Sequence, residues 1–214
     1  MMVGAWWAWL LALVLYGAFR LWYDNWRGPL SKAEIDHFMA KADETKMGEY
    51  SDPAVIRAFL EADDGREFIM SNLVGVHLGA VPHPVTGVPT QGLLLLQEYG
   101  KRFIKVLLRH GGHPMLAMRK AGGYVDSWNT PPDPGWHVVG AMRYRSRRDM
   151  MELATDPTLR DVHHLKTAGT AVTFSFPTQV IVGFAMRPRA WVALLLALLA
   201  ALAHLISVIA LLNP

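Results

Sequence analysis

Histidine is the residue type in this sequence that best suits proton transfer and metal binding, because its imidazole titrates near neutral pH. Four histidines of the central region stand near the expected ends of helices or strands: His110, His113, His163 and His164. Their spacing matches no metal-binding pattern such as two histidines one helical turn apart, so we expect no metal site. The chain has no cysteine, which excludes disulfides and thiolate ligands. His163 is a candidate ligand-pocket residue; the alternative is that these histidines flank turns in solvent.

Four further side chains are candidates for lining a ligand pocket: Asn72, Trp128, Arg143 and Tyr144. Asn72 interrupts an apolar strand, where a buried amide must form hydrogen bonds and would either orient a ligand or satisfy a neighbouring loop. Trp128 and Tyr144 either line the pocket or belong to the hydrophobic core. Arg143 opens a basic run that ends at Arg148 and faces either acidic lipid headgroups or solvent. No nucleophile–base pair is evident, so no catalytic residue is assigned.

His204 lies within an apolar segment near the C-terminus, and ionisable groups inside membranes are functional candidates by default. Ala200 precedes it in an Ala-x-x-x-His pattern, which resembles the helix motif with which antenna polypeptides ligate bacteriochlorophyll. One hypothesis is therefore that His204 binds a tetrapyrrole, either a pigment or a haem. The alternative is a neutral histidine packed against a partner helix. Nothing in the sequence requires a cofactor.

Both ends of the chain are apolar and long enough to form membrane-spanning helices. The first apolar stretch covers residues 3–23, and the second covers residues 190–212 without a charged residue. Side chains typical of a membrane interface flank both stretches: Trp6, Trp7, Trp22, Tyr23, Trp26, Arg187, Arg189 and Trp191. A cleaved signal peptide is the competing interpretation of the first stretch, but the sequence lacks the basic n-region and the cleavage site that it needs. The sequence thus predicts one transmembrane helix in residues 1–26 and another in residues 187–214.

Basic residues flank the two predicted membrane helices on their inner sides. Arg20, Arg27 and Lys32 lie at or after the end of the first helix, and Arg187 and Arg189 precede the second. The positive-inside rule therefore places the central region in the cytoplasm and both termini outside, as in a two-pass protein of the bacterial inner membrane.

The central region is predicted to contain a helical segment at 27–65 and an α+β domain at 66–186. In the helical segment, Ser31 and Glu34 can form a capping box, and Asp52 precedes a proline that starts a second helix. Strands are expected at 68–74, 114–118, 124–128, 137–144 and 174–184, with loops at 79–89 and 129–135. The order strand, helix, strand, strand, helix, strand is the ferredoxin-like βαββαβ arrangement. Because helices cover one face of such a sheet, we expect two sheets to pair into a dimeric α/β barrel.

Three stretches resemble small bacterial domains of unknown function in the dimeric α/β-barrel (ferredoxin-like) superfamily. They are Phe-Ile-Met-Ser-Asn-Leu at 68–73, Leu-Leu-Arg-His-Gly-Gly at 107–112, and Met-Arg-Tyr-Arg-Ser-Arg at 142–147, the last continuing to Thr155-Asp156-Pro157 and His163-His164. The resemblance covers residues 66–182 and implies the fold and dimerisation. It implies no particular reaction, because relatives with this fold include cofactor-free monooxygenases, muconolactone-type isomerases and haem-binding dismutases and peroxidases.

These features favour a non-enzymatic function: a membrane-anchored accessory or structural subunit of a larger integral-membrane complex, of respiratory or photosynthetic type. The expected partners are membrane lipid and either other integral-membrane subunits or a second copy of the chain. A formal net charge of +3 is too small to favour nucleic acid. The rival functions are a membrane-tethered barrel enzyme, either an oxygenase or an isomerase, and a binding module for a small hydrophobic ligand. Both rivals need a pocket with convergent polar groups.

Overall fold

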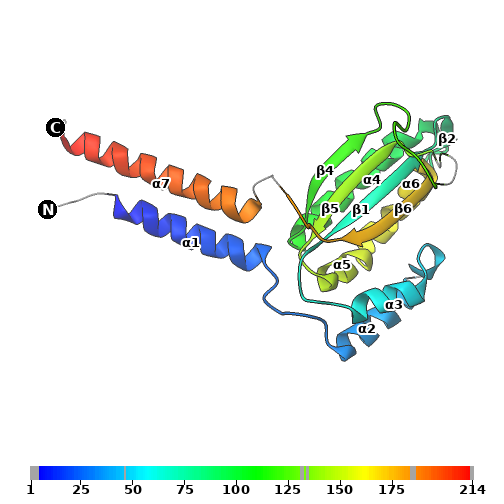
Figure 1. Ribbon diagram of the computed structural model, residues 1–214, viewed down its shortest axis with the longest axis horizontal. Helices are drawn as coiled ribbons and strands as arrows, with labels where there is room; N and C mark the ends of the chain where they lie inside the picture. Colours follow the sequence, from blue (N-terminus) through cyan, green and yellow to red (C-terminus); the bar gives the residue numbers. More distant parts are fainter. Residues whose placement is uncertain (1–4, 46, 131–132, 134, 184–186, 213–214) are drawn as a thin grey trace. The chain divides into compact units, whose positions relative to one another are not determined.

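A computed structural model of the chain describes residues 5–45, 47–130, 133, 135–183 and 187–212 (Figure 1). The chain forms two compact units. One contains the two ends, Met1–Trp26 and Ile181–Pro214, and the other contains Arg27–Val180. The first is helical and the second combines helices with an antiparallel sheet, so each is described by itself.

The larger unit is built on a four-stranded antiparallel sheet with the strand order β4-β5-β1-β6. Its strands are β1 (Phe68–Val76), β4 (His113–Arg119), β5 (Val138–Tyr144) and β6 (Thr170–Thr178). Helix α4 (Gly92–Arg109) connects β1 to β4, and helices α5 (Arg147–Ala154) and α6 (Pro157–Gly169) connect β5 to β6. A small hairpin of β2 (Ala80–Pro82) and β3 (Pro89–Gln91) precedes α4, within the predicted 79–89 loop. Along the chain, the sheet strands and their connecting helices therefore follow the predicted order.

Local hydrogen bonds explain where the helices begin. Helix α2 (Lys32–Glu44) starts at the predicted capping box: Ser31 Oγ accepts from the Glu34 N–H at 3.3 Å, and the Ser31 N–H donates to Glu34 Oε2 at 2.9 Å. Helix α3 (Pro53–Glu61) starts with the predicted proline after Asp52, whose carboxylate accepts from the Ala54 N–H. A short 3-10 turn, η1 (Met47–Glu49), separates the two helices. Both predicted helix starts are confirmed.

One hydrophobic core joins α2 and α3 to the sheet and its helices. Its fully buried members include Leu60 from α3, Leu107 from α4 and Met151 from α5, and Phe68 and Tyr144 contribute from adjacent strands. The rings of Phe68 and Tyr144 stack at 5.3 Å between centroids. The helical segment after residue 27 therefore belongs to the same compact unit as the sheet.

The two faces of the sheet differ. Side chains alternate along a strand, and Phe68, Met70, Met142 and Tyr144 point into the core shared with the helices; Figure 1 shows α4 and α6 on that face. The residues between them point to the other face. That face carries apolar side chains that are 42–62% exposed: Leu116, Met118, Phe174 and Phe176. It is the open face of the sheet.

Two strand predictions differ from the structure. Residues 124–128 form a loop and no strand, and Trp128 is 73% exposed. Strand β6 runs from Thr170 to Thr178, earlier than the predicted 174–184. The pairing of β6 with β1 stops at Thr178 because its partner there, Ile69, lies at the beginning of β1. Phe184 and the prolines of the predicted 129–135 loop (Pro131, Pro132 and Pro134) lie outside the described residues.

The smaller unit contains helix α1 (Trp6–Tyr23) and helix α7 (Pro188–Leu212). Among the described residues, α7 is the one helix that is long and apolar enough to cross a membrane. Helix α1 has 18 residues, and its tryptophans and Arg20 make it less apolar. A membrane-spanning role for α1 therefore stays a prediction.

Candidate functional site

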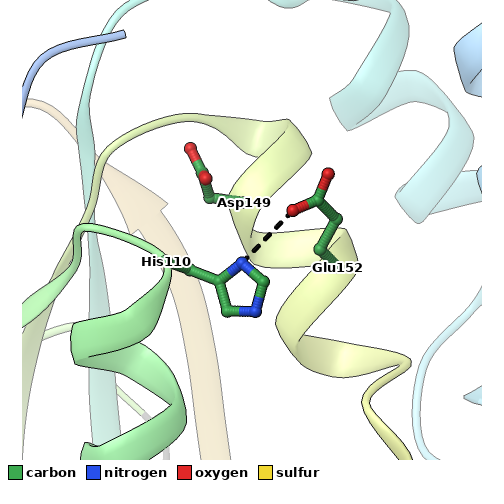
Figure 2. Close-up of side chains that lie close together, drawn as sticks. All are labelled: His110, Asp149 and Glu152. Carbon is green, nitrogen blue, oxygen red and sulfur yellow. Dashed lines mark ion pairs between the residues drawn. The ribbon is translucent and has the colours of Figure 1, made fainter. Parts of the chain in front are cut away.

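A cluster of titratable side chains lies where α4 ends and α5 begins. His110 follows the last residue of α4, and Asp149 and Glu152 stand one turn apart on α5, with one potential ligand atom from each residue within 4.8 Å of the others. Figure 2 shows the imidazole of His110 next to Glu152, and its Nδ1 lies 3.2 Å from Glu152 Oε2. One imidazole and two carboxylates are ligands that divalent metals accept, so the donor set alone would suit a cation.

The Asp149 carboxylate already binds other side chains of the protein. Its buried carboxylate accepts from Arg145 Nε at 2.9 Å and from the Ser146 hydroxyl, and Ser146 Oγ caps α5 by accepting from the Asp149 N–H at 3.1 Å. A metal ion would have to displace the Arg145 guanidinium from a buried carboxylate. In this arrangement the cluster joins α4 to α5, and its chemistry is that of ion pairs.

Arg143 has a structural position in the sheet. Its side chain is 3% exposed, and the guanidinium binds Glu67 Oε2 at 2.6 Å and 3.1 Å and the Gly111 carbonyl at 2.5 Å. A buried charge must be paired and hydrogen-bonded, and these bonds supply both. Arg143 thus fixes β5 to the start of β1 and to the turn after α4.

Asn72 and Tyr144 lie on the helix-covered side of neighbouring strands. The Asn72 amide donates to the Met70 carbonyl at 3.0 Å, and its oxygen accepts from the Ser175 hydroxyl at 2.8 Å, so it connects β1 to β6. Tyr144 is buried, and burial raises the pKa of its phenol above its usual value of 10.0. Burial also raises the pKa of Tyr99, on α4, to about 12.

His163 lies on α6 between two tyrosines. Its ring is 4.8 Å from that of Tyr50 and 6.3 Å from that of Tyr99. Burial, and then the charges of Lys166 and His164, lower the pKa of His163 below 6.5. Burial alone lowers the pKa of Lys166.

The five predicted pocket residues are therefore distributed over the larger unit. Arg143 and Tyr144 point to opposite faces of the sheet, since they are adjacent in β5. Trp128 lies in an exposed loop and His163 on α6, whereas Asn72 is bonded within the sheet. The structure does not bring these five side chains together around one cavity.

The described residues of the larger unit line cavities at different places. One, of about 430 Å³, lies between α2 and α5 and is lined by Lys41, Arg148 and Glu152 among others. The second, of about 420 Å³, lies at one end of the sheet, where Val76 of β1 and Val138 of β5 meet Leu93 of α4. The second cavity combines residues from four separate stretches of the chain, and no local pattern in the sequence indicated it.

In the smaller unit, α1 and α7 pack as an antiparallel pair. The Ala5 N–H donates to Ser207 Oγ at 3.2 Å near one end, and the Tyr16 hydroxyl donates to the Arg189 carbonyl at 3.1 Å nearer the other. Small side chains form the contact: Ala5, Ala8, Ala12, Ala200 and Ala203. Close approach through small residues is the packing used by helices in membranes.

The predicted interface residues lie near the ends of this helix pair. At one end Asp24 accepts from Arg189 Nε at 2.6 Å and from Arg20, and Tyr23, 3% exposed, lies under the Arg189 guanidinium. The tryptophans are exposed: Trp6, Trp7, Trp22, Trp26 and Trp191. Arg187 immediately precedes α7.

His204 lies on the side of α7 that meets α1. Its ring is 5.4 Å from the Trp6 ring in an edge-on arrangement. Its Nδ1 is buried and has no hydrogen-bond partner among the residues that the structure describes. His204 thus packs against a second helix, as the alternative to cofactor binding expects. Tetrapyrrole binding at His204 stays a prediction.

Comparison with known proteins indicates the fold. No protein-family model matches the chain, and no curated protein matches it. The crystal structure of RPA0582, a protein of unknown function from Rhodopseudomonas palustris, is similar with a TM-score of 0.50 and 22% identity, over 61% of this chain and 94% of that chain. The structure of methylated RPA0582 gives a TM-score of 0.51 and 22% identity, over 62% of this chain and 93% of that chain. The chain therefore contains a small α/β domain with solved structural neighbours whose own function is unknown.

Proposed function

We propose that this chain is a membrane-anchored accessory subunit, with α1 and α7 crossing the bilayer as an antiparallel pair. The observation that carries the proposal is the division of side chains in this pair. Alanines face inward, whereas large apolar side chains such as Leu13, Leu21 and Ile206 remain 66–69% exposed. An apolar surface of this kind needs lipid or other membrane helices to cover it.

The proposed orientation follows from the charges at one end of the pair. Arg20, Arg187 and Arg189 lie at the ends of α1 and α7 that connect to the larger unit, and Arg27 follows closely in the chain. By the positive-inside rule, the larger unit would lie in the cytoplasm of a bacterial cell and both termini outside. The Asp24 carboxylate, paired with two arginines, changes this balance little because acidic residues contribute weakly to orientation.

The proposed accessory role is supported by two exposed apolar surfaces, the open face of the sheet and the outer surface of the helix pair. We propose the ferredoxin-like assignment for the larger unit, supported by its strand order and chain order. Its open face carries Leu116, Met118, Phe174 and Phe176, which a second copy of the chain or another subunit would cover. The outer surface of the helix pair offers a second contact area within the membrane.

Purification of the native protein from membranes in a mild detergent tests this proposal. We expect it to co-purify with integral-membrane subunits in fixed stoichiometry, identified by mass spectrometry, and to resist extraction by alkaline carbonate. An absorption band in the same fraction would support a tetrapyrrole at His204. Release by carbonate would refute anchoring, and a colourless homodimer without other subunits would refute the accessory role.

A matched pair of variants separates anchoring from folding. Leu198→Asp places a charge in the middle of α7, at a cost of about 3 kcal/mol for insertion, and should lower the membrane-integrated fraction. Leu78→Asp changes an equally apolar residue that is 82% exposed in the larger unit and should leave that fraction unchanged. Equal effects of the two substitutions would contradict the assignment of α7 to the membrane.

A further inference from the structure

The cavity at the end of the sheet has apolar walls and a positively charged rim. Val76, Val138 and Leu93 form its walls, and Arg119, Lys120 and His137 supply its polar groups; among the described residues that line it, none is acidic. Its volume of about 420 Å³ falls within the usual range for small-molecule sites, roughly 300–1,000 Å³. Such a lining suits an anionic ligand with an apolar body.

His137 lines this cavity and has one ring nitrogen bonded to the backbone. Its Nδ1 accepts from the Val76 N–H at 3.1 Å. A ring nitrogen that accepts carries no proton, so the neutral imidazole carries its proton on Nε2. The backbone bond occupies Nδ1, so Nε2–H remains as the donor of this ring.

Arg119 supplies the charge. It lies opposite Val138 in the pairing of β4 with β5, so the two side chains share one face of the sheet and Arg119 stands next to an apolar residue of the cavity wall. Within the described residues Arg119 has no ion-pair partner, whereas Lys120 lies 3.3 Å from Asp133 Oδ2. Of the two cations, Arg119 is thus the one available to a ligand.

We propose that this cavity binds a small monocarboxylate with an apolar body. The Arg119 guanidinium takes the carboxylate through parallel N–H···O bonds, the geometry in which arginine binds this group best. His137 Nε2–H donates a third bond, and the apolar body packs against Val76, Val138 and Leu93. This site lies within the larger unit and does not depend on membrane anchoring.

Binding of hexanoate to the full-length protein in lipid nanodiscs, measured by calorimetry against empty nanodiscs, tests the proposal. Hexanol is the matched neutral probe. We expect saturable binding of hexanoate with a stoichiometry of one and no saturable binding of hexanol. Loss of a charged hydrogen-bond donor in Arg119→Gln should weaken hexanoate binding about 10- to 100-fold. Absence of hexanoate binding, or equal binding of hexanol, would overturn the proposal.

Two further variants distinguish a loss of binding from a loss of folding. Leu93→Glu introduces a carboxylate into the cavity that Arg119 lines, at the first turn of α4, where a negative charge favours the helix, so it should abolish binding without loss of stability. Arg102→Gln removes an exposed arginine of the same helix outside the cavity and should leave binding unchanged. Equal losses in Arg102→Gln and Arg119→Gln would reveal non-specific attraction and refute the site.

A chain-length series identifies the source of the acid. If affinity rises steadily from butanoate to decanoate, the ligand class is a lipid-derived fatty acid. If it peaks at a short chain, the class is a water-soluble acid. Both results support the carboxylate site, and equal, non-saturable binding of all lengths refutes it.

Discussion

Glu34→Gln should destabilise the larger unit, because the Glu34 carboxylate is the counter-ion of a buried arginine. Arg148, whose side chain is 5% exposed, binds both Glu34 oxygens at 2.8 and 3.2 Å, and Arg27 and the Ser31 N–H bind the same carboxylate at 3.0 and 2.9 Å. The Arg148 guanidinium, followed by the Ser31 N–H, lowers the pKa of Glu34 from 4.5 to about 2. Glutamine keeps the shape and removes the charge.

Two estimates of the magnitude agree. The pKa difference between 4.5 and about 2 corresponds to about 3.4 kcal/mol at most. The Glu34 side chain is 29% exposed, so solvent screening reduces this to about 2–3 kcal/mol. Removal of one partner from a buried ion pair costs about 3 kcal/mol. For a chain of this length, about 3 kcal/mol lowers the Tm by roughly 6–12 °C.

The pH dependence provides an independent check. Because the folded state lowers the pKa of this carboxylate, its contribution is complete above pH 4.5 and is lost as the pH falls toward 2. Thermal unfolding of the detergent-solubilised chain, followed by tryptophan fluorescence, should show a large Tm gap between Glu34→Gln and wild type at pH 7 that narrows at pH 3. Glu44→Gln, an exposed site on the same helix, is the control. The reasoning is refuted if the two variants melt alike at pH 7, or if the gap does not change with pH.

Three further predictions follow from the packing. Gly92→Ala should lower the free energy of unfolding by about 2 kcal/mol, because its Cβ would lie 2.6 Å from the last carbonyl oxygen of α6. Gly100→Ala, on the same helix, meets no atom within 4 Å and should raise the free energy of unfolding by about 0.5–1 kcal/mol. Chemical denaturation measures both changes. In this cysteine-free chain, Ala8→Cys combined with Ala200→Cys should cross-link within one molecule on mild oxidation; absence of a cross-link would contradict the helix pair. Burial lowers the pKa of His163 below 6.5, so the folded state loses stability as the pH falls below 6.5. His163→Phe should reduce this loss, which melting temperatures measured at several pH values would show.

Predictions from the sequence succeeded where a few neighbouring residues decide the outcome. The starts of α2 and α3 depend on Ser31 and Asp52, whose side chains bond to backbone groups two or three residues away. A strand depends on a distant partner, and residues 124–128 failed to form one although Tyr124, Val125 and Trp128 are residue types that favour strands. Tyr124 instead donates to Asp133 and remains in a loop.

The candidate site residues likewise depend partly on local sequence and partly on distant contacts. The sequence identified Asn72 as a polar residue in an apolar strand and Arg143 as the first residue of a basic run. Their partners, Glu67 and Ser175, follow only from the pairing of strands distant in sequence, and that pairing assigns both residues to the structure of the sheet. The sequence by itself determined the apolar ends, the helix starts and the order of elements, because these depend on composition and short-range bonds. Only the tertiary structure decided which polar groups are already paired and that Arg119 and His137 share a cavity, since these depend on contacts between residues far apart in the chain.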